Sequence, residues 1–216
     1  HPDIVEFISA KSGSAFQNFN ISVAVTDSFL DALARNARYD LVNPRSNAVV
    51  ASVPASDVFD LIASNAWRTG DPGLVFIDEM NRANPTPAAG AFESTNPCGE
   101  QPLLPFESCN LGSINVSKFV SGSGFDWPRL GAAVDTAVHF LDNVIDVCRY
   151  PLPRIEEITR RNRKIGLGVM GFAEALILMG LPYDSDAALD CAEKLMKFID
   201  DRAHKASAAL ARERGS

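Results

Sequence analysis

The chain has 216 residues, of which 46% are hydrophobic and 22% are charged, so it is long and apolar enough to form a sizeable core. Its net charge is −7 and no run of Lys and Arg is interleaved with aromatic residues, so we expect no binding to nucleic acid. No apolar stretch approaches the roughly 20 residues of a membrane span and no signal-peptide pattern opens the chain, which favours a cytoplasmic protein with reduced cysteines and no membrane contact.

Periodic apolar residues predict helices and strands that alternate along the chain. Helices are predicted over residues 3–11, 27–37, 56–69, 130–148, 154–162, 170–179 and 185–214. Strands are predicted over residues 18–25, 74–77, 110–116 and 164–169, and loops over residues 11–17, 81–90 and 121–124. Gly70 is a typical helix stop and Ser185 a typical helix cap. This alternation favours an α/β fold with a largely parallel sheet.

Residues 96–100 read Asn-Pro-Cys-Gly-Glu, and the proline and glycine exclude a regular helix. In an extended backbone, alternate side chains share one face about 6.6 Å apart, so Asn96, Cys98 and Glu100 would converge on one side. An amide, a thiol and a carboxylate together are typical of a reaction site. The alternative is a turn in which Cys98 is a buried small hydrophobic residue, and this pattern alone leaves both open.

The longer segments 94–103 (STNPCGEQPL) and 107–115 (ESCNLGSIN) resemble the catalytic finger loop of ribonucleotide reductases. The Asn-Pro-Cys-Gly-Glu form is most similar to the adenosylcobalamin-dependent class II branch. Further segments resemble family blocks in family order: residues 1–4, 18–23, 70–74, 140–146 and 165–173. The resemblance implies that residues 1–216 are one central segment of a ten-stranded α/β barrel, without a separate second domain. It places the finger loop at about residues 94–110 and makes the chain an interior piece of a longer catalytic subunit.

The resemblance also implies a role for each residue of the motif. Cys98 matches the cysteine whose thiyl radical removes hydrogen from C3′ of a ribonucleotide. Glu100 matches the carboxylate that accepts the 3′-hydroxyl proton, and Asn96 the amide that hydrogen-bonds the substrate hydroxyls. Pro97 and Gly99 complete the substrate-binding loop. Cys109 matches one cysteine of the redox-active disulfide, whose partner cysteine lies outside this chain.

The expected reaction is therefore reduction of ribonucleotides to 2′-deoxyribonucleotides for DNA precursor synthesis. The resemblance implies adenosylcobalamin as cofactor, bound mainly by parts outside this chain, deoxynucleotide or ATP effectors, a thioredoxin-type reductant and possible homodimerisation. The loop at 11–17 matches the segment that links the effector site to the substrate base. One alternative is a class I catalytic subunit with a separate radical-generating partner, and another is a non-catalytic nucleotide-binding or redox fragment. The isolated chain is expected to be inactive.

Other conspicuous residues are interpreted as structural. Cys148 is expected to face inward from its helix and Cys191 to pack in the last helix. His139 and His204 have no Cys or His at ligand spacing, so no metal site is predicted. Residues 166–171 match G-x-G-x-x-G but lack the flanking features of a dinucleotide site, which favours close strand–helix packing.

Overall fold

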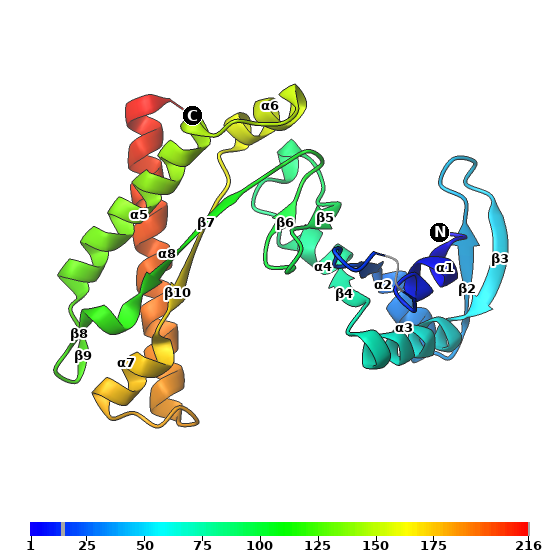
Figure 1. Cartoon of the computed structure of the whole chain (residues 1–216), viewed down its shortest axis with the longest axis horizontal. Helices are drawn as coiled ribbons and strands as arrows, with labels where there is room; N and C mark the ends of the chain where they lie inside the picture. The colour runs from blue at the N-terminus through cyan, green and yellow to red at the C-terminus, as the bar shows by residue number, and fades with distance from the viewer. Residues whose placement is uncertain (14–15, 216) are drawn as a thin grey trace. The chain divides into compact units, whose positions relative to one another are not determined.

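The computed structural model describes residues 1–13 and 16–215, which form two compact units, His1–Pro105 and Phe106–Ser216 (Figure 1). Each unit has its own hydrophobic core and is described here by itself. The expected mixed α/β class is confirmed. The strands of the described residues pair only two at a time, so these residues alone do not show a closed ten-stranded barrel. The loop predicted at 11–17 includes residues 14 and 15, which lie outside the described residues.

The first unit is built around a parallel strand pair that two helices cover. Its elements are α1 (Ile4–Ser9), β1 (Ser22–Val25), α2 (Asp27–Ala34), β2 (Arg38–Val42), β3 (Val49–Pro54), α3 (Ala55–Thr69), β4 (Gly73–Phe76), α4 (Ile77–Arg82), the 3₁₀ turn η1 (Pro87–Ala89), β5 (Ser94–Thr95) and β6 (Pro102–Leu103). Strands β1 and β4 pair in parallel, with Val23 opposite Leu74. Val23 and Val25 alternate inward onto Phe29 of α2 and Val58 of α3, which places the apolar core on this side of the pair.

The antiparallel hairpin β2–β3 has no counterpart among the elements predicted from sequence. Tyr39 and Leu41 alternate with exposed neighbours, and this short alternation is the signal that marks a half-buried strand. The turn closes where the amide of Asn43 donates to the carbonyl of Ala48. Asn47 adopts a positive φ of 55° in this turn, a conformation that asparagine tolerates better than most residues.

The second unit combines another parallel strand pair with two long helices. Its elements are β7 (Asn110–Asn115), the 3₁₀ turn η2 (Val116–Phe119), β8 (Val120–Ser121), β9 (Gly124–Phe125), α5 (Trp127–Val147), α6 (Pro153–Asn162), β10 (Ile165–Met170), α7 (Phe172–Met179) and α8 (Asp186–Arg214). Strands β7 and β10 pair in parallel, and α5 and α8 run side by side next to them (Figure 1). Leu130, Val134 and Val138 recur along one face of α5 and form the centre of the core.

Helix ends follow the sequence signals closely. Gly70 ends α3 in the left-handed conformation, and the hydroxyl of Ser185 accepts from the amide of Ala188 at 3.2 Å. The cap of α5 is Asp126, so this helix begins three residues before the predicted start at Leu130. No helix of the described residues has an apolar stretch long enough to cross a membrane.

Two cysteines of the second unit differ in their surroundings. The prediction that Cys148 faces inward is wrong, because α5 ends at Val147 and Cys148 is exposed in the following extended segment. Pro151 and Pro153 follow closely and favour an extended backbone, so the helix ends before Cys148 and its periodicity does not apply to this residue. Cys191 packs against the core, and burial raises the pKa of its thiol. The prediction of ordinary packing is therefore confirmed for Cys191.

Close packing accounts for two glycines of the G-x-G-x-x-G match. A Cβ at Gly168 would lie 3.4 Å from the hydroxyl oxygen of Ser113 on the paired strand. At Gly171, where φ is +71°, a Cβ would overlap the side-chain oxygen of Asn115. That oxygen accepts the amide of Ser117 at 3.2 Å and its hydroxyl at 2.8 Å. The glycines thus bring β10 and the start of α7 against β7 and η2.

Replacing Gly171 with alanine should therefore destabilise the protein. Left-handed strain costs about 1–2 kcal/mol and loss of the Asn115 cap about 0.5–2 kcal/mol, so we expect roughly 1.5–4 kcal/mol in total. Gly122→Ala is the matched control, because Gly122 also has a positive φ of 60° but an added Cβ there meets nothing within 4 Å. Thermal unfolding of the intact protein would measure the loss of stability caused by each substitution. Equal effects of the two substitutions would contradict the packing explanation.

Candidate active site

The Asn-Pro-Cys-Gly segment forms a closed β-turn in the first unit. The amide of Gly99 donates to the carbonyl of Asn96 at 3.1 Å, and the amide of Asn96 donates to the carbonyl of Gln101 at 3.2 Å. Strands β5 and β6 pair antiparallel on either side of the turn. The prediction of an extended backbone here is therefore wrong. The residues explain the turn, because Asn at the first position, Pro at the second and Gly at the fourth are each favoured in the commonest β-turn.

The side chain of Asn96 helps to close this turn. Its Oδ1 accepts the amide of Gln101 at 2.9 Å, and Asn96 is half-buried. Pro97, Cys98, Gly99 and Glu100 are all exposed. The alternative prediction of a turn with a buried Cys98 was thus right about the backbone and wrong about burial. The turn presents its thiol and the neighbouring carboxylate outward, where a reactant can approach both.

Cys109 belongs to the second unit, where it directly precedes β7 and is partly buried. Its neighbours are held by α6 and by the segment that follows it. The buried carboxylate of Glu107 accepts from Asn162 at 2.9 Å and forms an ion pair with Lys164 at 2.5 Å. The hydroxyls of Ser108 and the buried Thr159 hydrogen-bond at 2.7 Å.

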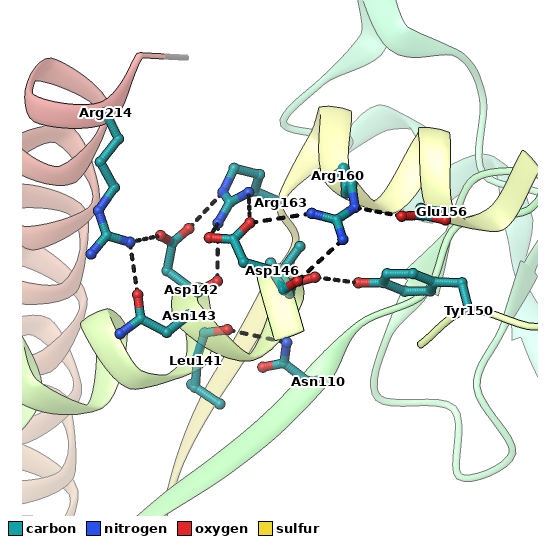
Figure 2. Close-up of polar contacts among 11 residues, drawn as sticks. Asn110, Leu141, Asp142, Asn143, Asp146, Tyr150, Glu156, Arg160, Arg163 and Arg214 are labelled. Carbon is teal, nitrogen blue, oxygen red and sulfur yellow. Dashed lines mark hydrogen bonds and ion pairs between the residues drawn. The ribbon is translucent and has the colours of Figure 1, made fainter. Parts of the chain in front are cut away.

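The residue after Cys109 is also fixed. The side-chain amide of Asn110 donates to the carbonyl of Leu141 on α5 at 3.2 Å (Figure 2). Its Oδ1 is buried and has no hydrogen-bond partner among the described residues. Polar contacts on both sides therefore hold the backbone at Cys109 in one position.

A network of charged side chains joins α5, α6 and α8 close to this segment (Figure 2). Arg163 lies between α6 and β10 with a positive φ of 47°, and donates to Asp142 at 2.7 Å and to Asp146 at 2.9 Å. Arg214 also donates to Asp142, at 2.9 Å. The hydrogen bond from Arg163 holds the pKa of Asp146 below its usual range, and the hydrogen bond to Asp142 raises the pKa of Arg163. The network thereby fixes residues 162–164, which carry two of the partners of Glu107.

Four residues that contact the segments of the candidate site were not predicted from the sequence. Glu107, Asn162 and Lys164 surround the segment of Cys109, and Asn20 contacts the turn of Cys98. Glu107 offered a weak signal in the sequence, because it is a charged residue two positions before the cysteine of the predicted redox pair. Among the described residues, no group of three or more His, Cys, Asp or Glu side chains is arranged to hold a metal ion.

Glu107→Gln should destabilise the second unit, because it removes the buried carboxylate that pairs with the ammonium group of Lys164. The side chains of Glu107 and Lys164 are only 1% and 17% exposed, and breaking a buried pair typically costs about 3–5 kcal/mol. The control is Glu174→Gln, which removes an exposed pair with Lys118 and should cost less than about 1 kcal/mol. Calorimetric unfolding of the intact protein would compare them, and a Glu107 effect no larger than the control would refute the argument.

Comparisons with known proteins agree on one family. The family described as "Ribonucleotide reductase, barrel domain" matches residues 1–216. Vitamin B12-dependent ribonucleoside-diphosphate reductases of Thermoplasma acidophilum and Mycobacterium tuberculosis are each 55% identical over all of this chain. The chain spans 28% and 32% of the lengths of these two relatives. The ribonucleoside-diphosphate reductase subunit alpha of Chlamydia trachomatis is 37% identical over 76% of the chain, which covers 16% of that relative. The chain therefore belongs to the ribonucleotide reductase family and matches its barrel domain.

Proposed function

We propose that this chain is the central barrel segment of an adenosylcobalamin-dependent ribonucleotide reductase. The observation that carries the proposal is the closed turn, which exposes Cys98 between the half-buried amide of Asn96 and the exposed carboxylate of Glu100. The names of the two relatives with 55% identity support both the reaction and the vitamin B12-derived cofactor. The segment would supply the finger loop, at about residues 94–110, to a ten-stranded barrel completed by other parts of the protein.

Adenosylcobalamin, when bound, supplies the one-electron chemistry that oxidises a thiol to a thiyl radical. The exposed position of Cys98 fits this role, because the thiol is accessible to a group held by another part of the protein. The thiyl radical of Cys98 takes the hydrogen atom from C3′ of the ribonucleotide, so that an S–H bond forms as the C3′–H bond breaks. Sulfur suits this step because the two bonds are of comparable strength, which makes the exchange reversible.

The remaining steps use the neighbouring polar groups. Glu100 accepts the proton of the 3′-hydroxyl as a general base, while Asn96 hydrogen-bonds the substrate hydroxyls. The 2′-hydroxyl leaves as water. Cys109 and its partner thiol supply two electrons and two protons and become a disulfide, Glu100 returns its proton to the 3′ oxygen, and Cys98 returns its hydrogen atom to C3′. One ribonucleotide and two thiols thus yield one deoxyribonucleotide, one disulfide and one water.

Several finer features belong to the same proposal. The substrate would be a ribonucleoside diphosphate or triphosphate, and a thioredoxin-type protein would reduce the disulfide. Deoxynucleotide or ATP effectors would act through the loop at residues 11–17. A homodimer and a cytoplasmic location are consistent with the family. The names of the relatives support the nucleotide substrate most directly, since all three named above specify ribonucleoside diphosphates.

A second candidate is a class I catalytic subunit that receives its radical from a separate metal-containing protein. The similarity to the subunit alpha of Chlamydia trachomatis favours this candidate. The higher identity to the B12-dependent relatives favours the first. The full-length protein would distinguish them, because only the first candidate requires adenosylcobalamin and no second subunit for turnover.

Cys98→Ser in the full-length enzyme should abolish deoxynucleotide formation, because the serine O–H bond is too strong for a reversible exchange with C3′–H. The assay combines purified enzyme, adenosylcobalamin, a dithiol and each ribonucleoside di- or triphosphate, with deoxynucleotides measured by chromatography. Cys148→Ser is the matched control, since Cys148 is also exposed but lies outside the motif. Substantial turnover by Cys98→Ser would disprove the thiyl assignment.

Cys109→Ser should fail at a later step than Cys98→Ser. Hydrogen abstraction at C3′ does not need the dithiol, whereas completion of the reduction does, so the reaction should start and then release free base. Product analysis with labelled substrate would detect this, with Cys191→Ser as the control for a packed cysteine in the same unit. Normal multiple turnover of Cys109→Ser with a dithiol reductant would remove Cys109 from the redox pair.

A further inference from the structure

The turn that carries Cys98 is attached to a distant segment of the same unit. The side-chain amide of Asn20 donates to the carbonyl of Pro97 at 3.1 Å, across 77 positions of the sequence. This carbonyl belongs to the peptide bond that joins Pro97 to Cys98. The hydrogen bond therefore acts on the backbone immediately before the thiol, whereas the bonds from Asn96 and Gln101 close the turn only upon itself.

One ion pair holds the backbone on both sides of Asn20. The ammonium group of Lys11 donates to the carbonyl of Phe19 at 2.6 Å and to Oδ2 of Asp71 at 2.7 Å. Oδ1 of Asp71 accepts the amide of Ile21 at 3.3 Å. Residues 19 and 21 are thus both attached to the same pair, and Asn20 lies between them. The carbonyl of Ile21 accepts the amide of Gly73 at 2.9 Å, which connects the backbone next to Asn20 to the parallel pair of β1 and β4.

The pair is well placed to act as an anchor. The side chains of Lys11 and Asp71 are only 14% and 18% exposed, so water screens their attraction less than that of a surface pair. The hydrogen bond from Lys11 holds the pKa of Asp71 below its usual range, so Asp71 is ionised at neutral pH. Asp71 directly follows Gly70, the cap of α3, which ties the pair to a helix of the core.

We propose that Asn20 is a positioning residue that aligns Cys98 for hydrogen transfer, and that the Lys11–Asp71 pair sets the position of Asn20. The proposal rests on the proposed function. Hydrogen transfer requires the sulfur at contact distance from C3′, and a misplacement of about 1 Å can lower a rate about 10²-fold. Asn20 does not touch the reacting atoms and works through the peptide bond between Pro97 and Cys98. Its loss should reduce the rate of the chemical step without abolishing it.

The test uses full-length enzyme with adenosylcobalamin and three variants at one position. Asn20→Ala removes the donor, and Asn20→Asp keeps the size but places a carboxylate, which cannot donate, against the carbonyl of Pro97. Both should lower kcat about 10–100-fold with little change in the KM for nucleotide. Asn20→Gln retains the amide donor and should recover part of the rate.

Two comparisons separate positioning from loss of folded protein. Asn18→Ala is the matched control, because Asn18 is an exposed asparagine two residues away with no hydrogen-bond partner among the described residues. Its kcat should equal that of the unaltered enzyme, and melting temperatures should agree across the Asn18 and Asn20 variants. Equal kcat for Asn20→Asp and the unaltered enzyme overturns the proposal. So does a loss of rate in Asn20→Ala that is fully explained by a lower melting temperature.

The role of the ion pair is tested by combining substitutions. Asp71→Asn should lower kcat like Asn20→Ala, and the double variant should be no slower than the slower single variant, because both changes interrupt one chain of contacts. Losses that multiply would overturn the link between the pair and Asn20. Should Asp71→Asn not fold, Lys11→Met replaces it, since it removes the same pair from the other side. An unaltered enzyme without reductase activity would overturn the proposed function itself, whereas an active enzyme insensitive to Asn20 would overturn only the positioning role.

Discussion

Closure of the turn at residues 96–99 is the constraint on which the candidate site depends. Proline restricts the backbone at the second position, and Gly99 adopts a φ of +88° that most residues avoid. The backbone bonds between Asn96 and Gln101 then bring β5 and β6 together. The hydrogen bonds that close the turn involve Asn96, Gly99 and Gln101, and Cys98 lies at the tip between them with its thiol exposed. The turn therefore makes the cysteine accessible and limits its movement at once.

Polar contacts hold each cysteine segment, whereas apolar packing holds each core. Near Cys98 these contacts are the Asn20 hydrogen bond and the half-buried pair of Lys11 and Asp71. Near Cys109 they are the buried carboxylate of Glu107 and its partners. Hydrogen bonds have directional geometry, so they fix a backbone position more narrowly than apolar contact does. Reactive groups that must meet a substrate at defined distances need support of this kind.

Local signals explain why most elements were predicted from sequence. Apolar periodicity identified α3, α5 and α8, and the cap residues Gly70 and Ser185 marked helix ends correctly. The motif at residues 96–100 was singled out because an amide, a thiol and a carboxylate alternate there, and the resemblance to ribonucleotide reductases supplied the predicted role of each residue. The backbone at Cys98 was predicted wrongly because proline and glycine exclude a helix but are compatible with both an extended segment and a turn. The hydrogen bonds of Asn96 decide for the turn, and they form only when residue 101 folds back.

The contacts that escaped prediction share a physical cause. Asn20 and Pro97 are 77 positions apart, Lys11 and Asp71 are 60 apart, and Glu107 and Lys164 are 57 apart. Asp71 and Lys164 lie just before strands that return to a parallel partner after a helical crossover, whereas Pro97 lies in the turn between the antiparallel strands β5 and β6. A lysine or an asparagine in a loop carries no periodic signal, so its partner becomes visible only once the strands are paired. Positioning residues of a reactive loop are therefore the class that a single sequence hides best, and three-dimensional structure is what exposes them.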